Sequence, residues 1–176
     1  MLYGSERVLI AMIRRSVCIA FLSLLLVSCS WYSSGDTHAL QNHRETWENL
    51  DVANYQFTFD SKCFCDQGPL PAQIVVRAET LHAVLDPETK DTLRARGSNR
   101  PVWKERSRQY PTVDRLFEIV DGELSKLYNR PDSIHVEYND EYGFPEHIYI
   151  DEQANTFDDE LTITAKNLEV DLAEKQ

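Results

Sequence analysis

Two cysteines separated by one residue form the most reactive pair in the sequence, Cys63 and Cys65. They follow a run in which Tyr55, Phe57 and Phe59 alternate with polar residues, the two-residue period of a strand with one buried face. If this strand continues unbroken, both thiols point to the same side as the aromatic rings. Three states stay open for the pair: a structural disulfide, two free thiols, or a redox-active or metal-binding pair.

A disulfide between Cys63 and Cys65 would require a bend in the strand. Cα atoms two residues apart in an extended strand are separated by ~6.6 Å, whereas disulfides prefer ~5.5 to 6 Å. Two thiolates also supply only half of a tetrahedral zinc site. His82 is the nearest histidine in the sequence, but the strand pattern predicts that it faces away from Leu81 and Ala83.

A second group of residues could bind a cation. Asp151, Asp158, Asp159 and Glu160, with Asn155 nearby, place several oxygen ligands on a short segment, which is what a hard cation such as calcium requires. The spacing does not match an EF-hand loop. The alternative interpretation is a solvated acidic turn.

A third group could perform acid and base chemistry. His135 and Glu137 alternate with apolar residues on one predicted strand, and pairing Val136 with Ile148 places Glu137 opposite His147. A cross-strand pair of this kind is usually a surface contact. Because no nucleophile stands at a recognisable spacing from these residues, we do not expect an enzyme.

The N-terminal segment predicts export and lipid attachment. Arg14 and Arg15 precede an apolar run from Val17 to Val27, which is the order of regions in a secretory signal, and the run is too short to span a membrane. The residues Leu26 to Cys29 resemble the bacterial lipobox, and this resemblance implies lipidation of Cys29 and cleavage before it.

This interpretation divides the chain into a signal peptide over residues 1–28, a tether over 29–36, one domain over 37–168 and a frayed tail over 169–176. Met12 is an alternative start, because residues 1–11 contribute nothing to such a signal. In enteric bacteria, an aspartate directly after the lipidated cysteine resembles an inner-membrane retention mark. This chain has Ser30 at that position. In a Gram-negative host we therefore expect the outer membrane, with the domain facing the periplasm.

The charge of the chain argues against two kinds of partner. The formal net charge is −11, which argues against binding nucleic acid and against electrostatic docking on anionic lipid. One stretch, from Lys90 to Arg108, is basic instead, and it is either a solvated loop or a docking strip.

The hydrophobic pattern predicts a sequence of helices and strands. Helical spacing of apolar residues marks two amphipathic helices, and two-residue alternation marks the strands. The stretch between them lacks periodicity and holds Pro87, Gly97 and Pro101, which indicates a long exposed loop. The predicted elements are a helix over 37–50, strands over 55–65, 73–78 and 81–85, the loop over 86–109 with a helical turn near Leu93, a helix from Pro111 through Leu127, and strands over 134–138, 147–151 and 161–165.

This order predicts an α+β fold in which two helices pack on one face of an antiparallel sheet of about six strands. Several of its motifs resemble a family of bacterial lipoproteins catalogued as domain of unknown function six-one-seven-four, over Trp47 to about Leu168. The resemblance implies no activity, because the family is uncharacterised. The matching residues are Trp47, Asn54–Tyr55, Cys63–Phe64–Cys65, Pro111 to Asp114, Leu116–Phe117, Tyr138, Tyr142 to Pro145, Ile150–Asp151 and Asp158 to Glu160.

We therefore expect a lipid-anchored protein of the cell envelope that acts as a non-catalytic binding or interaction module. The membrane, reached through the N-terminal lipid, and another envelope protein are the expected partners, and no cofactor is expected. The alternative is a thiol-redox or metal-handling envelope protein that uses Cys63 and Cys65.

Overall fold

The computed structural model describes residues 34–156 and 158–171. The predicted signal peptide and the predicted lipidation site at Cys29 lie outside these residues. Within the described part, no helix is long and apolar enough to cross a membrane. The described residues from Asp36 onward belong to one compact unit.

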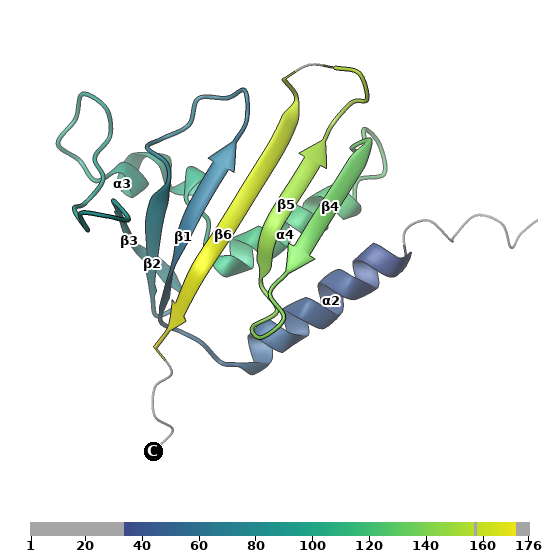
Figure 1. Ribbon diagram of the computed structural model, residues 1–176, viewed down its shortest axis with the longest axis horizontal. Helices are drawn as coiled ribbons and strands as arrows, with labels where there is room; N and C mark the ends of the chain where they lie inside the picture. Colours follow the sequence, from purple (N-terminus) through teal and green to yellow (C-terminus); the bar gives the residue numbers. More distant parts are fainter. Residues whose placement is uncertain (1–33, 157, 172–176) are drawn as a thin grey trace, which may run out of the picture. The chain divides into compact units, whose positions relative to one another are not determined.

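The described residues form an α+β fold with a six-stranded antiparallel sheet, which confirms the predicted class (Figure 1). The two longer helices stand at the predicted places, one before the first strand and one before the fourth. The elements are α2 (Ser34–Asn49), β1 (Tyr55–Lys62), β2 (Ala72–Arg77), β3 (Thr80–Leu85), α3 (Val102–Arg106), the 3-10 helix η1 (Ser107–Gln109), α4 (Val113–Leu124), β4 (Ser133–Tyr138), β5 (Pro145–Asp151) and β6 (Glu160–Val170).

The sheet consists of two halves that meet in its middle. The strand order is β3-β2-β1-β6-β5-β4, so the first strand of the chain pairs with the last. In the second half, Val136 of β4 lies opposite Ile148 of β5, and Glu137 lies opposite His147, as the alternation predicts. The predicted register of this strand pair is therefore confirmed.

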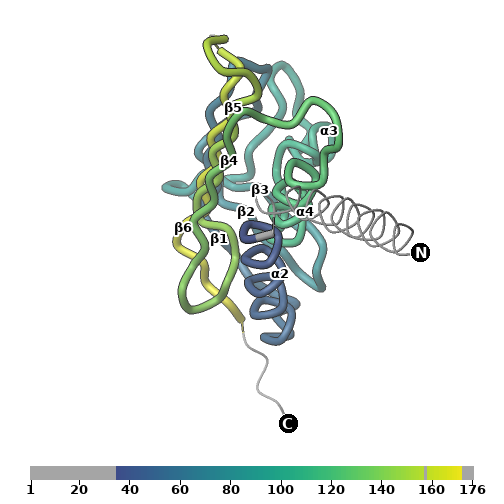
Figure 2. The backbone as a smooth tube through the Cα atoms, turned by 90° about the vertical axis from the view of Figure 1, so that its right-hand side faces the viewer, coloured from purple at the N-terminus to yellow at the C-terminus, as the bar shows by residue number. Residues whose placement is uncertain are grey.

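The helices cover one face of the sheet, as Figure 2 shows with the sheet seen edge-on. The side chains of Tyr55, Phe57 and Phe59 on β1 point into this layer and are at most 3% exposed. From α4, Leu116 and Phe117 pack into the same core. The two-residue alternation of β1 thus separates a buried aromatic row from the polar residues on the open face.

Polar contacts with α2 and β1 hold the start of α4. The hydroxyl of Tyr55 accepts a hydrogen bond from the backbone N–H of Val113 at 3.0 Å. The Thr112 side chain caps the helix by accepting from the N–H of Arg115 at 3.3 Å. The indole N–H of Trp47 donates to the Asp114 carboxylate at 3.3 Å. Three elements are therefore joined at one helix terminus.

The stretch 86–109 is not the long exposed loop that its composition predicts. It contains α3 and η1, and Val102 is fully buried. Around Leu93 the chain is extended instead of helical: the Leu93 N–H donates to the Val84 carbonyl, and the Val102 N–H donates to the Leu93 carbonyl, both at 2.9 Å. Ala95 is also buried, and Leu93 and Trp103 pack partly buried against the core. Periodicity could not reveal this, because these residues form two short groups separated by polar residues.

Three predicted boundaries are also wrong. β1 ends at Lys62 and does not continue through the cysteines. α4 ends at Leu124, and Leu127, predicted to continue its apolar stripe, is 81% exposed. β6 runs to Val170, which pairs with Tyr55, so the start of the predicted tail at residue 169 is part of the sheet.

We expect Gly143→Ala to destabilise the protein by about 2 kcal/mol, because residue 143 has a φ of +79°. A Cβ atom there would also lie 2.6 Å from the backbone carbonyl oxygen of His43 in α2. Urea unfolding measures the change. Gly122→Ala is the matched control: its Cβ meets nothing within 4 Å, and an alanine inside α4 should stabilise by up to about 1 kcal/mol. Equal stabilities for wild type and Gly143→Ala would contradict this account.

Candidate functional site

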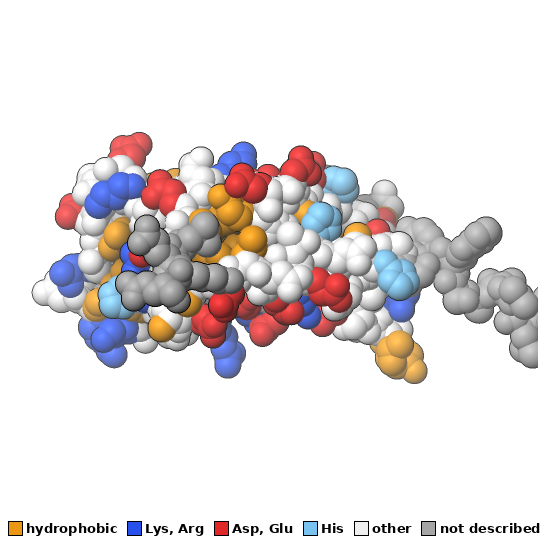
Figure 3. Space-filling view, turned by 90° about the horizontal axis from the view of Figure 1, so that it is seen from below, with side chains coloured by type: hydrophobic (Ala, Val, Ile, Leu, Met, Phe, Trp, Pro, Cys, Tyr) orange, Lys and Arg blue, Asp and Glu red, His pale blue; other side chains and the backbone are white. Residues whose placement is uncertain are grey.

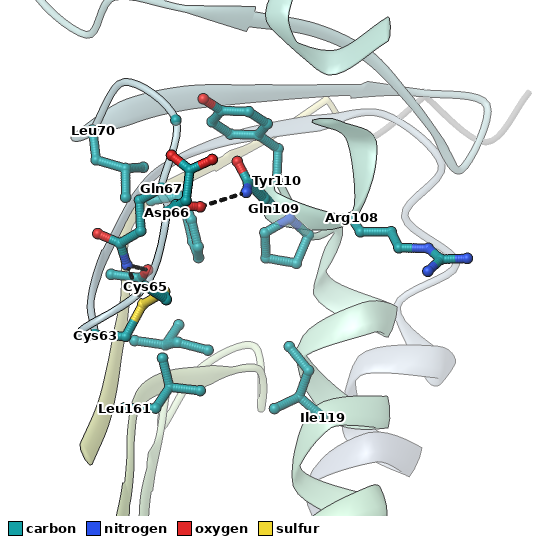
Figure 4. Close-up of a pocket in the computed structure, with 15 residues that line it drawn as sticks. Cys63, Cys65, Asp66, Gln67, Leu70, Arg108, Gln109, Tyr110, Ile119 and Leu161 are labelled. Atoms are coloured by element: carbon teal, nitrogen blue, oxygen red, sulfur yellow. Dashed lines mark hydrogen bonds between the residues drawn. A yellow bond between two sulfur atoms is a disulfide. The ribbon is translucent and has the colours of Figure 1, made fainter. Parts of the chain in front are cut away.

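The candidate site is a cavity of about 190 Å³ between the sheet and α4, at the end where β1 leaves the sheet. Phe59 of β1 and Ile163 of β6 line it from the sheet, and Ile119 lines it from α4. Leu161 and Leu70 complete its apolar lining (Figure 4). The sequence places these residues far apart, so the cavity exists only in the folded chain.

A disulfide between Cys63 and Cys65 forms one wall of this cavity. The two Cα atoms are 5.3 Å apart, which is closer than the spacing of an extended strand. The predicted bend is present, because β1 ends one residue before Cys63. In Figure 4 the disulfide lies across the cavity from Ile119.

The amide of Gln67 holds this wall from the loop side. Its Nε2 donates to Ser61 Oγ at 2.7 Å and to Cys63 Sγ at 2.9 Å. Cys63 is half-buried, whereas Cys65 is exposed. The two sulfur atoms therefore lie in different surroundings although only one residue separates them.

The loop after the disulfide is fastened to the segment before α4. Gln109 Nε2 donates to the Asp66 carbonyl at 2.8 Å, and the Arg106 guanidinium lies 3.0 Å from the Asp66 carboxylate. The Tyr110 hydroxyl donates to the Pro69 carbonyl at 3.3 Å. Burial raises the pKa of Tyr110 to about 12, an effect that nearby Arg106 partly opposes, so this hydroxyl stays protonated at neutral pH.

The predicted cation site receives no support from the structure. Burial raises the pKa of Asp151, and the charges of Asp159, Asp132 and Glu160 raise it further. These acidic groups therefore repel one another without a neutralising partner in the predicted set. Among the residues that the structure describes, no group of three or more His, Cys, Asp or Glu side chains could hold a metal ion.

The predicted acid and base residues lie on the open face of the sheet. His135 Nε2 is 3.5 Å from the Glu137 carboxylate, and both side chains are about two-thirds exposed, with 67% and 65% of their surface accessible. His147 lines a polar depression of about 490 Å³ together with Thr162 and Thr164, and neither His135 nor Glu137 lines it. The structure thus does not gather the three residues in one pocket.

The basic stretch from Lys90 to Arg108 makes contacts within the protein. Lys90 Nζ donates to the Gln73 side chain at 3.0 Å on β2, and Arg106 pairs with Asp66. Lys90 and Arg106, two of the basic residues that suggested a docking strip, therefore bind other residues of the same chain.

Sequence reasoning identified the cysteine pair but missed the other residues of this site. Gln67, Gly68 and Leu70 lie in a run that reads only as a break between strands, and Gln109 and Tyr110 lie about forty positions later. The one available signal was the density of Gly and Pro between Asp66 and Pro71, which indicates a turn and not a cavity wall.

The comparisons with known proteins give a family and no function. The model of a family described as "Family of unknown function (DUF6174)" matches residues 39–170. No curated protein and no solved structure matches the chain.

We expect Gly68→Ala to destabilise the protein by about 2 kcal/mol, because its Cβ would overlap with the hydroxyl oxygen of Tyr110. Tyr110→Phe alone should cost about 1 kcal/mol through the lost hydrogen bond to Pro69. The double variant should cost less than the sum of both, because the phenylalanine removes the overlapping atom. Thermal unfolding of the four proteins measures this coupling, and strict additivity would contradict the close packing of residues 68 and 110.

Proposed function

This chain belongs to the DUF6174 family of unknown function, and we propose that it is a lipid-anchored protein of the bacterial cell envelope that binds an apolar group without catalysing a reaction. The apolar cavity beside the Cys63–Cys65 disulfide is the observation that carries the binding role. The lipobox at Leu26 to Cys29 supports the anchor.

The size and lining of the cavity define what it could bind. An engineered apolar cavity of ~150 Å³ in another protein binds benzene, and the present cavity of about 190 Å³ is somewhat larger. Phe59, Ile119 and Ile163 offer it only carbon surface. A ring-sized or branched apolar group, carried by a small molecule or by a side chain of a partner protein, fits this description.

The polar groups at the edge of the cavity favour binding over catalysis. The amide N–H groups of Gln67 and Gln109 are engaged with atoms of the same loop region. The Tyr110 hydroxyl, with its raised pKa, is a poor proton donor near neutral pH and already donates to Pro69. These groups shape the walls of the cavity instead of presenting an acid or a base to it.

The anchor fits the charge of the domain. Acidic and basic side chains both lie on the face seen in Figure 3, and the acidic ones predominate in the chain as a whole, which carries a formal charge of −11. Such a surface is repelled by anionic lipid head groups, so a covalent lipid would be needed to keep it at a membrane. We propose a tether that starts at residue 29 and leads into α2, which begins at Ser34, with the domain facing the periplasm from the outer membrane in a Gram-negative host.

Filling the cavity should abolish binding of an apolar probe. We expect indole to shift the NMR signals of the Leu161 and Ile163 methyl groups saturably in the full chain, held in detergent. Ile119→Phe should weaken this binding at least about tenfold, because the ring occupies the cavity. Ile134→Phe is the matched control, since Ile134 is also a partly buried core residue but does not line the cavity. Equal indole binding by both variants would refute the assignment of the cavity as the binding site.

Lipid attachment should depend on Cys29. In a bacterial host fed a labelled fatty acid, we expect the wild-type protein to carry the label and to sediment with membranes. Cys29→Ser should retain less than about a tenth of either signal, because no other acyl chain holds the protein. Cys18→Ser, which changes a cysteine inside the apolar run, should retain both. Labelling of the Cys29→Ser protein would rule out this anchor.

A further inference from the structure

The two cysteines of the disulfide differ in their exposure to solvent. Cys65 is exposed, and Cys63 is half-buried beside the cavity. Phe64 between them is 81% exposed, so among the described residues this side of the pair faces solvent. A reagent that approaches from solvent therefore reaches the sulfur of Cys65 more readily than that of Cys63.

Within residues 34–156 and 158–171, a hydrogen-bond donor stands at Cys63 Sγ and none stands at Cys65 Sγ. Gln67 Nε2 is 2.9 Å from Cys63 Sγ, and the same amide is held by Ser61 Oγ at 2.7 Å. A donor in this position stabilises negative charge on the sulfur that it contacts. Cys63 is therefore the better leaving group of the pair, because a sulfur that is more stable as a thiolate leaves faster.

We propose that the pair is a thiol–disulfide exchange site in which an incoming thiolate attacks Cys65 Sγ. A bond forms between the attacking sulfur and Cys65, the Cys63–Cys65 bond breaks, and its electron pair stays on Cys63 as a thiolate beside Gln67. A second thiol of the partner then displaces Cys65 from the mixed disulfide. Two partner thiols are oxidised to one disulfide, the cysteine pair gains two electrons, and the two thiol protons end on Cys63 and Cys65.

The cavity defines the kind of thiol that reacts best, an inference that rests on the proposed binding of apolar groups. Cys63 and Cys65 line the same cavity as Ile119 and Leu161, so an apolar group next to an attacking thiol could occupy it during exchange (Figure 4). Binding of this group would hold the thiol near Cys65 and raise its effective concentration. The partner is thus a thiol flanked by an apolar side chain or substituent.

The site of attack can be read directly from a trapped intermediate. The full chain with Cys18→Ser and Cys29→Ser, which leaves only the pair, is exposed briefly to reduced glutathione, quenched with acid, alkylated and mapped by fragment-ion mass spectrometry. We expect glutathione on Cys65 and the alkyl group on Cys63, with a preference of about tenfold or more. Equal loading, loading of Cys63, or no mixed disulfide at millimolar glutathione would overturn the proposal.

The role of Gln67 has its own measurement. In Gln67→Leu the exchange with glutathione should slow about fivefold, and the pKa of the Cys63 thiol in the reduced protein should rise, as read from thiolate absorbance in the Cys65→Ser background. Gln56→Leu is the matched control, since Gln56 lies on β1 and its amide pairs with Glu169, away from the disulfide. An unchanged thiol pKa in Gln67→Leu would refute the assigned role.

The preferred partner is tested separately from the site of attack. Benzyl mercaptan and 2-mercaptoethanol are thiols of similar acidity, and we expect the benzyl compound to reduce the disulfide about tenfold faster. Ile119→Phe should remove this preference without moving the attack away from Cys65. Equal rates with correct trapping at Cys65 would refute the apolar partner, while the exchange site would stand. The indole titration decides the binding role of the cavity separately.

Discussion

The pairing of β1 with β6 is the contact on which the rest of the domain depends. It runs from Tyr55 opposite Val170 to Lys62 opposite Thr162, and it joins two three-stranded halves into one sheet. Three strands alone offer a narrow apolar face. Joined, they provide a face wide enough for α2 and α4 (Figure 2). Tyr55 is buried there, with its ring edge-on to Trp47 of α2 and its hydroxyl accepting from the N–H of Val113 in α4.

This pairing also creates the cavity. Lys62 at the end of β1 lies opposite Thr162 of β6, and beyond this point β1 leaves the sheet while β6 continues to Glu160. The departure leaves the apolar side chains of Leu161 and Ile163 covered by α4 on one side and by the disulfide loop on the other. The cavity thus forms because two neighbouring central strands, β1 and β6, end at different positions at the same end of the sheet (Figure 1).

The parts of the fold that were predictable from the sequence are those governed by local periodicity. The strands around Val136 and Ile148 were placed with the correct register because each alternates over several residues. Leu127 was misplaced because its spacing fits the α4 stripe although the helix has already ended at Leu124. Val102 was missed because an isolated apolar residue gives no periodic signal, and only its burial against the rest of the core accounts for it.

Only part of the candidate site could be predicted from the sequence. A Cys-x-Cys pair after a strand is visible in the sequence, and the bend that it needs follows from strand geometry. The contacts that give the two sulfur atoms different surroundings are not visible there. Gln67 becomes informative only when its amide is seen beside Cys63, and Gly68 only when Tyr110, from a segment forty residues later, is seen against it.

The disulfide closes only a short loop, and this limits how much it can stabilise the domain. In the chain-entropy account, a bridge that closes a loop this short restricts the unfolded chain little and contributes roughly 2 kcal/mol or less. The core beneath it, with Phe59 at 3% and Ile163 at 4% exposure, is held by the sheet and by α4. The loop beyond it is fastened by Gln109, Arg106 and Tyr110 through contacts that involve no sulfur atom. Opening the bridge would therefore leave the other walls of the cavity in place, and the proposed exchange would not require the domain to unfold.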